Sequence, residues 1–389
     1  MNSTDLVNND AGGSNSERNP CVYFEFFVGT ILIGSLCLLG IIGNSAAFVI
    51  FNRHKTETTT LFLLKALAIS DSFLLLASII IYVLKPIHLW NGSLEGFYNN
   101  FEHVQKFVWP ASMMCHTTTI MLTVLVTFNR YIAVCKPWQP LSNQHTNRCT
   151  YTEVFAVVVF AFLFNVPRYF EHHVIDKKIS NDTNRTSTNI NLGDNKIYQL
   201  VYSNILYFPV MYIVPLISLA YLNIKLIRTI KTLNEKRQVL TGHKMSNDDQ
   251  ITNVIIAVVF IFIICQTPAL INQVLWLIFS QEDRQCGRFH FYYTRLSDVL
   301  VVTNSGVNFI IYCLFGKSFR RLFFQTVCPG RSYGTHKVQL RACGATEENE
   351  GLTVKSANGE PEAVALKSLL VESSKSAIVQ ELNTDHAQV

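Results

Sequence analysis

Seven long apolar segments constrain what this chain can fold into more than any other feature. They cover about 24–51, 60–87, 103–134, 152–170, 198–228, 251–279 and 292–314. Each has about 20 residues or more, the length at which an α-helix spans the hydrocarbon core of a bilayer. Charged residues make up only 15% of the chain, whereas soluble domains carry about 25%. The sequence therefore predicts an all-α membrane protein, a bundle of seven transmembrane helices.

The segments between the spans predict the orientation of the chain. Arg53 and Lys55 follow the first span, and Arg18 is the only Lys or Arg before it, so the positive-inside rule places the N-terminus outside. The predicted outer side also carries the glycosylation signals at Asn2, Asn91, Asn181 and Asn184. We therefore expect a multi-pass plasma-membrane protein with a cytoplasmic C-terminus. Residues 1–10 contain no apolar core, so the first span is expected to direct insertion.

Composition divides the chain into three parts. Residues 1–23 are predicted to be a glycosylated extracellular tail, 24–328 the seven-span domain, and 329–389 a disordered cytoplasmic tail. Within the domain, residues 316–327 alternate basic and aromatic side chains after the last span. This pattern predicts a short amphipathic helix on the membrane surface. Cys328, which follows it, is a candidate for palmitoylation, and an unmodified thiol is the alternative.

Polar residues inside the spans predict a central polar cluster. Asn304, Asn308 and Tyr312 recur every four residues in the last span, so they share one helix face. That face must meet other helices or trapped water, because unpaired polar groups are costly in lipid. The residues expected to converge there are Asn44, Asp71, Thr119, Asn304 and Asn308. The cluster predicts bound waters and a small cation, most simply sodium; hydrogen bonding between helices alone is the alternative.

Short motifs occur in a fixed order along these spans. They are Gly43-Asn44 in the first, LAISD ending at Asp71 in the second, Asn129-Arg130-Tyr131 in the third, Cys265-Gln266-Thr267-Pro268 in the sixth and NFIIY at 308–312 in the last. In this order they resemble the rhodopsin-like (class A) G-protein-coupled receptors, over about residues 24–328. Trp109-Pro110 and the NVPRYFE segment at 165–171 are similar to invertebrate FMRFamide-type neuropeptide receptors.

Three positions depart from the pattern of the family that the chain resembles. Asn129 stands where an acid usually precedes the arginine, and Gln266 stands where the sixth span usually has tryptophan. Phe309 replaces the usual proline before the final tyrosine. We therefore expect the trigger of activation to differ in detail from that of the family.

The resemblance implies a receptor and not an enzyme, with no cofactor beyond the sodium ion considered above. A short amidated peptide is expected to bind outside, and a heterotrimeric G protein inside. Membrane lipid surrounds the bundle, and a receptor kinase and arrestin are expected to bind the C-terminal tail.

The resemblance also implies a mechanism of activation. Arg130 is expected to be held at rest by Asp248, because its usual neighbour is the uncharged Asn129. Outward movement of the sixth span then releases Arg130. The switch residues of that span are Cys265, Gln266 and Pro268, and the other coupling residues are Tyr131, Asn308 and Tyr312.

The outer ends of the spans predict the class of ligand. The outer half of the third span has Ser112 and no aspartate, which disfavours a small amine. Acids beside aromatic rings instead suit the cationic, aromatic end of a peptide such as Arg-Phe-amide. The predicted pocket residues are Ser112, His116, Glu171, Tyr207, Gln273, Trp276 and Asp298. The alternative is that the acids only solvate or cap the helix ends.

The cysteines predict an unusual disulfide. The family normally ties the third span to the second outer loop, but Gln105 lies near the first position and residues 171–197 contain no cysteine. Cys21 and Cys286 are the cysteines that lie clearly outside, in an oxidising compartment. We expect them to pair, with two free thiols as the alternative.

Other classes of protein are disfavoured. The chain has no inverted repeat or ring of like charge that a transporter or channel would use, and no arrangement typical of an intramembrane enzyme. No basic block is interleaved with aromatics, so nucleic acid is not an expected partner. No metal is expected, because His116 stands alone and His172-His173 has no second ligand pair. Another peptide or a lipid is the alternative ligand, and a seven-span channel or transporter the alternative class.

Overall fold

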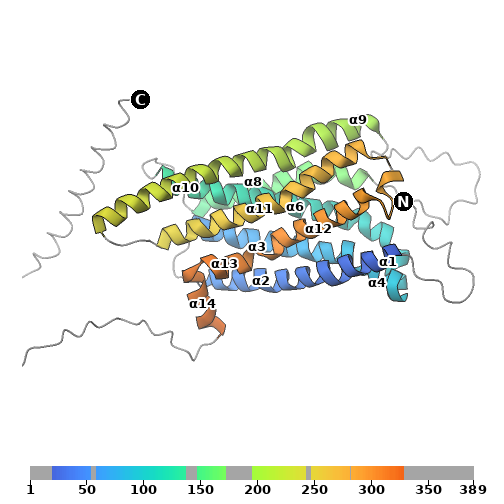
Figure 1. Cartoon of the computed structure of the whole chain (residues 1–389), viewed down its shortest axis with the longest axis horizontal. Helices are drawn as coiled ribbons and strands as arrows, with labels where there is room; N and C mark the ends of the chain where they lie inside the picture. The colour runs from blue at the N-terminus through green and yellow to red at the C-terminus, as the bar shows by residue number, and fades with distance from the viewer. Residues whose placement is uncertain are drawn as a thin grey trace, which may run out of the picture. The chain divides into compact units, whose positions relative to one another are not determined.

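Helices account for the regular structure of the part of the chain that can be described. The computed structural model describes residues 20–53, 58–136, 147–171, 195–241, 247–280 and 282–327. Within these ranges there are helices and connecting turns but no β-strand. The chain divides into a unit Met1–Tyr333 and a second unit Gly334–Val389, and the second lies outside the described residues. The long helices of the first unit lie side by side as a bundle (Figure 1).

The first three spans are built as long, nearly continuous rods. The first comprises α1 (Pro20–Glu25), the π-helical η1 (Phe26–Ile33) and α2 (Gly34–Asn52). The second comprises α3 (Thr59–Ser78), the π-helical η2 (Ile79–Val83) and α4 (Leu84–Asn91). The short helix α5 (Glu95–Asn99) connects it to the third span, which is the single helix α6 (Phe101–Cys135).

The remaining spans complete the bundle. The fourth comprises α8 (Asn147–Asn165) and the 3-10 turn η3 (Val166–Phe170). The fifth comprises α9 (Lys196–Tyr198), the π-helical η6 (Gln199–Tyr207) and η7 (Pro209–Ile213), and α10 (Val214–Thr241). The sixth is α11 (Asn247–Ile278), and the 3-10 turn η8 (Glu282–Arg284) leads to the seventh, α12 (Phe289–Gly306) with α13 (Asn308–Phe315). Six rods are long and apolar enough to cross a membrane, and the bent pair α12 and α13 makes up to seven. The predicted all-α bundle of seven spans is confirmed.

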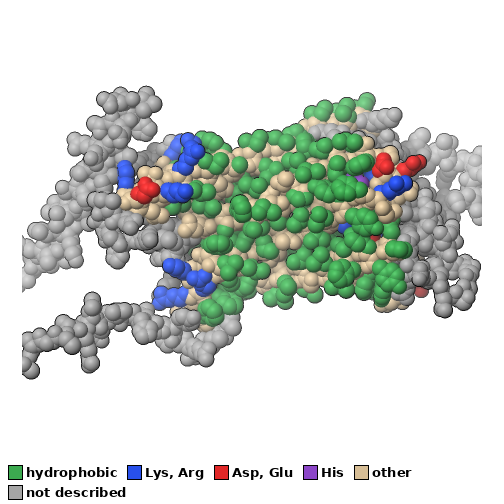
Figure 2. Space-filling model, in the orientation of Figure 1, with side chains coloured by type: hydrophobic (Ala, Val, Ile, Leu, Met, Phe, Trp, Pro, Cys, Tyr) green, Lys and Arg blue, Asp and Glu red, His purple; other side chains and the backbone are tan. Residues whose placement is uncertain are grey.

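The outside of the bundle is apolar. Phe155 and Leu163 of α8 are 69% and 63% exposed, which suits lipid and not water. Figure 2 shows hydrophobic side chains over the middle of the bundle, with Lys and Arg gathered at the end that holds α14 (Lys317–Val327). The predicted amphipathic helix over 316–327 is therefore present as α14, and it turns away from the direction of the rods (Figure 1).

Helix α10 continues beyond the predicted end of the fifth span. The apolar pattern ends near residue 228, but the helix runs to Thr241. Residues 229–241 include Lys, Arg, Gln, Glu and Leu, which have high helix propensity. The charged residues among them do not favour lipid. Hydrophobic length predicts the part of a helix inside the membrane, and it does not detect such an extension.

The last span is bent where sequence analysis predicts a continuous helix over 292–314. Helix α12 ends at Gly306 and α13 begins at Asn308, with a bend of 49° between them. No proline lies in this stretch, and a Ser-Gly pair, here Ser305-Gly306, is another known cause of a helix kink. The expected polar stripe is therefore divided between two helices that point in different directions.

Two glycines of α2 allow the last span to approach closely. A Cβ on Gly40 would lie 2.8 Å from the Cα of Gly306 and 2.7 Å from Leu75. One turn further on, a Cβ on Gly43 would lie 2.8 Å from the Cβ of Phe309. Small residues at such crossings let membrane helices pack closely. The phenylalanine that replaces the family's usual proline is thus accommodated by a glycine on α2.

The contact between Gly40 and Gly306 generates a prediction about stability. Gly40→Ala should lower the stability of the purified protein by about 1–3 kcal/mol, because the new methyl group meets backbone that must move. A lower melting temperature in detergent would show this loss. Gly96→Ala is the control, since its Cβ would meet nothing within 4 Å. Equal melting temperatures for the two variants would contradict the packing described here.

Candidate functional site

A buried carboxylate lies at the centre of the bundle. Asp71 of α3 is completely buried. Thr119 of α6 donates a hydrogen bond to its Oδ1 (3.0 Å), and Asn308 of α13 donates one to its Oδ2 (2.6 Å). Hydrogen bonds to a charged group contribute about 1.5–3 kcal/mol each. Three spans are therefore joined through one side chain.

Other polar groups extend this central cluster. Asn44 of α2 donates to the backbone carbonyl of Ser305 (2.9 Å), close to the bend in the last span. The hydroxyls of Ser70 and Thr119 lie 3.0 Å apart. Asn304 is buried one residue before Ser305. Of the residues expected in the cluster, Thr119 and Asn308 bond to Asp71, whereas Asn44 bonds to the Ser305 backbone and Asn304 is only shown to be buried. Ser70, which sequence analysis did not assign to the cluster, lies within hydrogen-bond distance of Thr119.

A second buried contact joins α6 to α11. The amide nitrogen of Gln266 donates to Nε2 of His116, at 3.1 Å. The two residues are 1% and 4% exposed, and the Gln266 carbonyl oxygen has no hydrogen-bond partner among the described residues. Cys265, the neighbouring predicted switch residue, is also buried, and Pro268 lies inside the same helix one turn nearer its outer end. The contact lies where the family's usual tryptophan is replaced.

The C-terminal end of α6, which is predicted to face the inside, carries the predicted coupling residues. Arg130 is 7% exposed, and the side chain of Asn129 donates to its own helix at the carbonyl of Leu125 (3.1 Å). Asp248 lies in the first turn of α11, but its side chain lies outside the described residues, so its expected pairing with Arg130 stays a prediction. Tyr131 lies half-buried beside Arg130.

Tyr312 packs between the first span and the surface helix. Its ring contacts Phe51 of α2 and Phe319 of α14, with ring centroids 5.3 and 5.5 Å apart. The residue is 2% exposed, and its hydroxyl has no partner among the described residues. A buried hydroxyl without a partner is unfavourable. The Tyr312 hydroxyl can therefore gain a hydrogen bond if the side chain moves.

At the end of the bundle that is predicted to lie outside, Glu171 is already bound by other side chains of the protein. Arg168 lies 3.5 Å from one carboxylate oxygen, and the Tyr198 hydroxyl donates to the other (2.8 Å). The Arg168 guanidinium also lies over the ring of Tyr207, 4.1 Å from its centre. We call Arg168, Glu171, Tyr198 and Tyr207 the Arg168 cluster. In this cluster, Arg168 occupies the place beside Glu171 where sequence analysis expects the cation of the ligand.

Asp298 is also paired, within a cluster that sequence analysis missed in part. Arg295 donates to Asp298 (3.3 Å) and to Glu25 of α1 (2.6 Å), and the Tyr82 hydroxyl donates to the other oxygen of Asp298 (3.4 Å). We call Glu25, Arg295, Asp298 and Tyr82 the outer cluster. Glu25 carries no motif in the sequence, and only the fold shows that it meets the last span.

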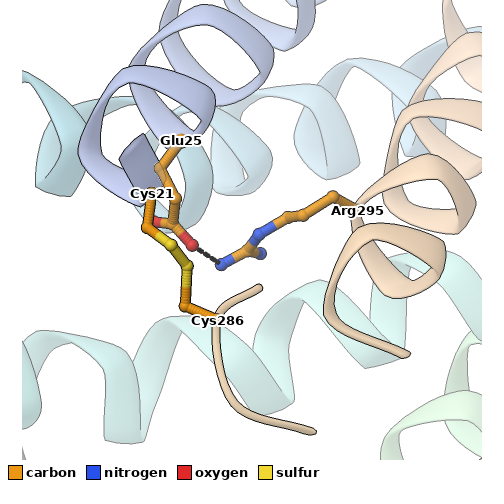
Figure 3. Close-up of a disulfide and its surroundings, with 4 residues drawn as sticks. All are labelled: Cys21, Glu25, Cys286 and Arg295. Atoms are coloured by element: carbon orange, nitrogen blue, oxygen red, sulfur yellow. Dashed lines mark hydrogen bonds and ion pairs between the residues drawn. A yellow bond between two sulfur atoms is a disulfide. The ribbon is translucent and has the colours of Figure 1, made fainter. Parts of the chain in front are cut away.

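A disulfide lies beside the outer cluster. Cys21 is bonded to Cys286, as expected from the sequence, and the bond ties α1 to the segment before α12 (Figure 3). The Glu25–Arg295 ion pair lies next to it in the same view. A covalent bond and an ion pair therefore hold the start of the first span against the outer end of the seventh.

The other predicted pocket residues lie on the spans around these clusters. Ser112 is buried, and Tyr207 is buried with its hydroxyl directed to the sulfur of Met113 (3.6 Å). Gln273 is half-buried. Trp276 is 45% exposed, with the Arg284 guanidinium 3.9 Å from its ring centre.

Most of the predicted modification sites lie outside the described residues. These are Asn2, Asn181, Asn184 and Cys328. Asn91 is exposed at the end of α4. Among the described residues, no three His, Cys, Asp or Glu side chains are grouped so that they could hold a metal ion.

An apolar groove on the side of the bundle is separate from the two outer clusters and shares Ser70 with the central cluster. It has a volume of about 720 Å³ and is lined by residues of α2, α3, α6 and α8, among them Phe62, Phe73 and Phe162. Its lining residues Phe73 and Phe162 are 59% and 54% exposed, as expected of a surface that lipid chains cover in a bilayer.

Comparison with known proteins agrees with this architecture. A family model described as "7 transmembrane receptor (rhodopsin family)" matches residues 43–312. The FMRFamide receptor of Drosophila melanogaster is 29% identical over 309 residues, which cover 77% of this chain and 53% of the relative. The FMRFamide peptide receptor frpr-18 of Caenorhabditis elegans is 30% identical over 289 residues, 74% of this chain and 66% of the relative.

A vertebrate receptor is also similar. The type-1 angiotensin II receptor B of Xenopus laevis is 24% identical over 339 residues, 83% of this chain and 87% of the relative. The matches to the two invertebrate receptors span about half and two thirds of those proteins. The family match takes in the polar centre, the Arg130 motif and the bent last span. The chain belongs to the rhodopsin family of seven-transmembrane G-protein-coupled receptors.

Proposed function

We propose that this chain is a plasma-membrane receptor that binds a short amidated peptide outside the cell and activates a heterotrimeric G protein inside. Its similarity to two FMRFamide receptors over about three quarters of its length carries this proposal. A member of this receptor family is not an enzyme and needs no cofactor for its activity. The alternatives are a receptor for another peptide or a lipid, and a seven-span channel or transporter.

The surface of the bundle supports an orientation with the N-terminus outside. Lys and Arg side chains gather at the end that holds α14 (Figure 2), as the positive-inside rule requires of a cytoplasmic end. Asn91, in a glycosylation signal, is exposed on α4, and α4 lies at the opposite end of the bundle (Figure 1). Arg130 then lies toward the G protein, with a receptor kinase and arrestin as further partners of the tail.

The ligand pocket is proposed between the outer cluster and the buried His116–Gln266 contact. The spans that surround this region carry Ser112, Gln273 and Trp276. Asp298 supplies a carboxylate, and its side chain is 20% exposed. Glu171 and Tyr207 line one side of this pocket. Glu171 does not attract the cation of the ligand there, because Arg168 already neutralises it. Such a pocket offers aromatic rings and negative charge to the Arg-Phe-amide end of a peptide.

Activation is proposed to pass through two hydrogen-bonded contacts in the bundle. A ligand above His116 can shift its bond with Gln266 and so move α11, which Pro268 allows to bend. The bend at residues 306–308 lets α13 move relative to α12 and carry Tyr312 away from Phe51 and Phe319. The inner end of α11 then opens and exposes Arg130. A ligand produces this shift to the extent that it binds the open arrangement more tightly.

The central cluster is proposed to hold a sodium ion at rest. The two side chains that donate to Asp71, Thr119 and Asn308, are neutral, so they do not cancel a buried negative charge, and an uncompensated charge is costly there. A small cation beside Asp71 would balance it. Hydrogen bonding without an ion, with a protonated Asp71, is the alternative.

A peptide panel tests the proposed function. Membranes from cells expressing the chain should show GTPγS exchange when amidated peptides ending in Arg-Phe-amide are added, and little with the same peptides as free acids, because the C-terminal amide is part of the ligand. Exchange driven by lipids and by none of the peptides would favour a lipid receptor. Ligand-driven ion flux in liposomes without exchange would favour a channel or transporter.

Replacement of Arg130 separates binding from coupling. Arg130→Ala should keep peptide binding and lose peptide-stimulated nucleotide exchange, because the residue acts at the inner end of α6. Lys136→Ala is the control, since it removes an exposed charge at the end of the same helix. Normal exchange in Arg130→Ala would refute the coupling role and leave an arginine that only extends to the lipid head groups.

Sodium dependence tests the central cluster. Replacing choline chloride with sodium chloride at equal ionic strength should lower peptide affinity about 5-fold or more in the unmodified chain, because the ion stabilises the resting arrangement. Asp71→Asn should abolish this difference while it keeps a side chain of similar shape. An equal response of both proteins to sodium would contradict an ion at Asp71.

A further inference from the structure

The outer end of the bundle holds two arginine-carboxylate clusters with different charge balances. In the Arg168 cluster, one guanidinium faces one carboxylate, that of Glu171. In the outer cluster, Arg295 lies between two carboxylates, those of Glu25 and Asp298. The first cluster is neutral, whereas the second keeps one negative charge.

The two clusters also differ in how accessible they are. The side chains of Arg168 and Glu171 are 11% and 13% exposed. Those of Arg295, Glu25 and Asp298 are 28%, 18% and 20% exposed. The carboxylates that carry the excess charge are therefore more exposed than the neutral pair. Partial burial also reduces screening by water and salt, which strengthens attraction for a cation.

Aromatic rings surround the accessible cluster. Arg295 lies 6.0 Å from the ring centre of Tyr82 and 5.8 Å from that of Phe291. Phe24, next to Glu25, packs edge-on against Tyr292 with ring centroids 4.7 Å apart. Rings at this distance favour guanidinium groups through cation–π attraction. The cluster is therefore suited to hold a second guanidinium beside the one that it already contains.

The position of Glu25 is fixed by covalent structure. Cys21 lies four residues earlier on α1, on the same helix face as Glu25, and its disulfide to Cys286 holds that turn beside α12 (Figure 3). The disulfide therefore places the glutamate where Arg295 and Asp298 can meet it. Without that bond, the carboxylate would lie near the start of a span whose first residues are free to fray.

We propose that Glu25, acting with Asp298, forms the subsite for a single cationic side chain of the peptide ligand. The proposal rests on the proposed function and names the group that selects for charge. Arg295 remains in place and orients both carboxylates, and the incoming guanidinium brings the cluster to neutrality. Glu171 does not select for charge, because Arg168 already balances it. An acidic or uncharged side chain at that position of the ligand is therefore disfavoured.

A pair of peptides that differ only in charge tests this subsite. Phe-Met-Arg-Phe-amide is compared with its analogue in which citrulline, the uncharged isostere, replaces arginine. On the full-length receptor the analogue should be about 10- to 100-fold weaker, the range expected for one charge-assisted contact. Glu25→Gln should weaken the arginine peptide by a similar factor and change the citrulline peptide little, so that the gap between the two narrows.

Glu171→Gln is the matched control, because it makes the same chemical change in the neutral cluster. It should leave the ratio of the two potencies as in the unmodified receptor, even if both potencies fall. A narrowed ratio in Glu171→Gln together with an unchanged ratio in Glu25→Gln would overturn the proposal. An unchanged ratio in both variants would overturn it as well.

Further variants separate charge selection from loss of folding. Surface amount is measured through an extracellular tag. If Glu25→Gln does not reach the surface, Asp298→Asn is expected to narrow the same ratio, and an unchanged ratio there contradicts the subsite. Glu25→Asp, which keeps the charge, should restore part of the preference for arginine. If the unmodified receptor answers no amidated peptide, the proposed function fails and this proposal falls with it; a normal response with an unchanged ratio overturns only the subsite.

Discussion

The structure depends on one constraint: a carboxylate deep in the bundle must be satisfied without water. Asp71 receives hydrogen bonds from Thr119 and Asn308 on two other spans, and leaving it unpaired in a medium of low dielectric would cost several kcal/mol. The helices must therefore cross where these three side chains can meet. Gly40 and Gly43 permit this crossing, because they allow the last span to lie directly against the first.

The same constraint suits the interior to the proposed transmission of a signal between the two ends of the bundle. Polar groups that are bonded to one another inside an apolar bundle can exchange partners, but they cannot simply be exposed to lipid. His116 and Gln266 form one such contact below the outer clusters, and Tyr312 carries a buried hydroxyl that lacks a partner among the described residues. Discrete arrangements of this kind give a receptor two states that a ligand can choose between.

Much of the fold was predictable because hydrophobic length and motif order report directly on membrane spans. The central cluster followed from the spacing of Asn304 and Asn308, and the Cys21–Cys286 bond from the lack of other outer cysteines. The bend at residues 306–308 was missed, because a Ser-Gly pair signals a kink less clearly than proline does. Glu25 and Arg295 were missed because their meeting is set by how the first and seventh spans pack, which no local pattern encodes.

The central claim is that a peptide bound outside rearranges the polar interior and opens the inner end of α11. The direct test is the distance between labels introduced as unnatural amino acids at Lys136, at the end of α6, and at Asn253 of α11. The account predicts a longer distance when an activating peptide is added. An unchanged distance distribution, under conditions in which the same peptide stimulates nucleotide exchange, would contradict it.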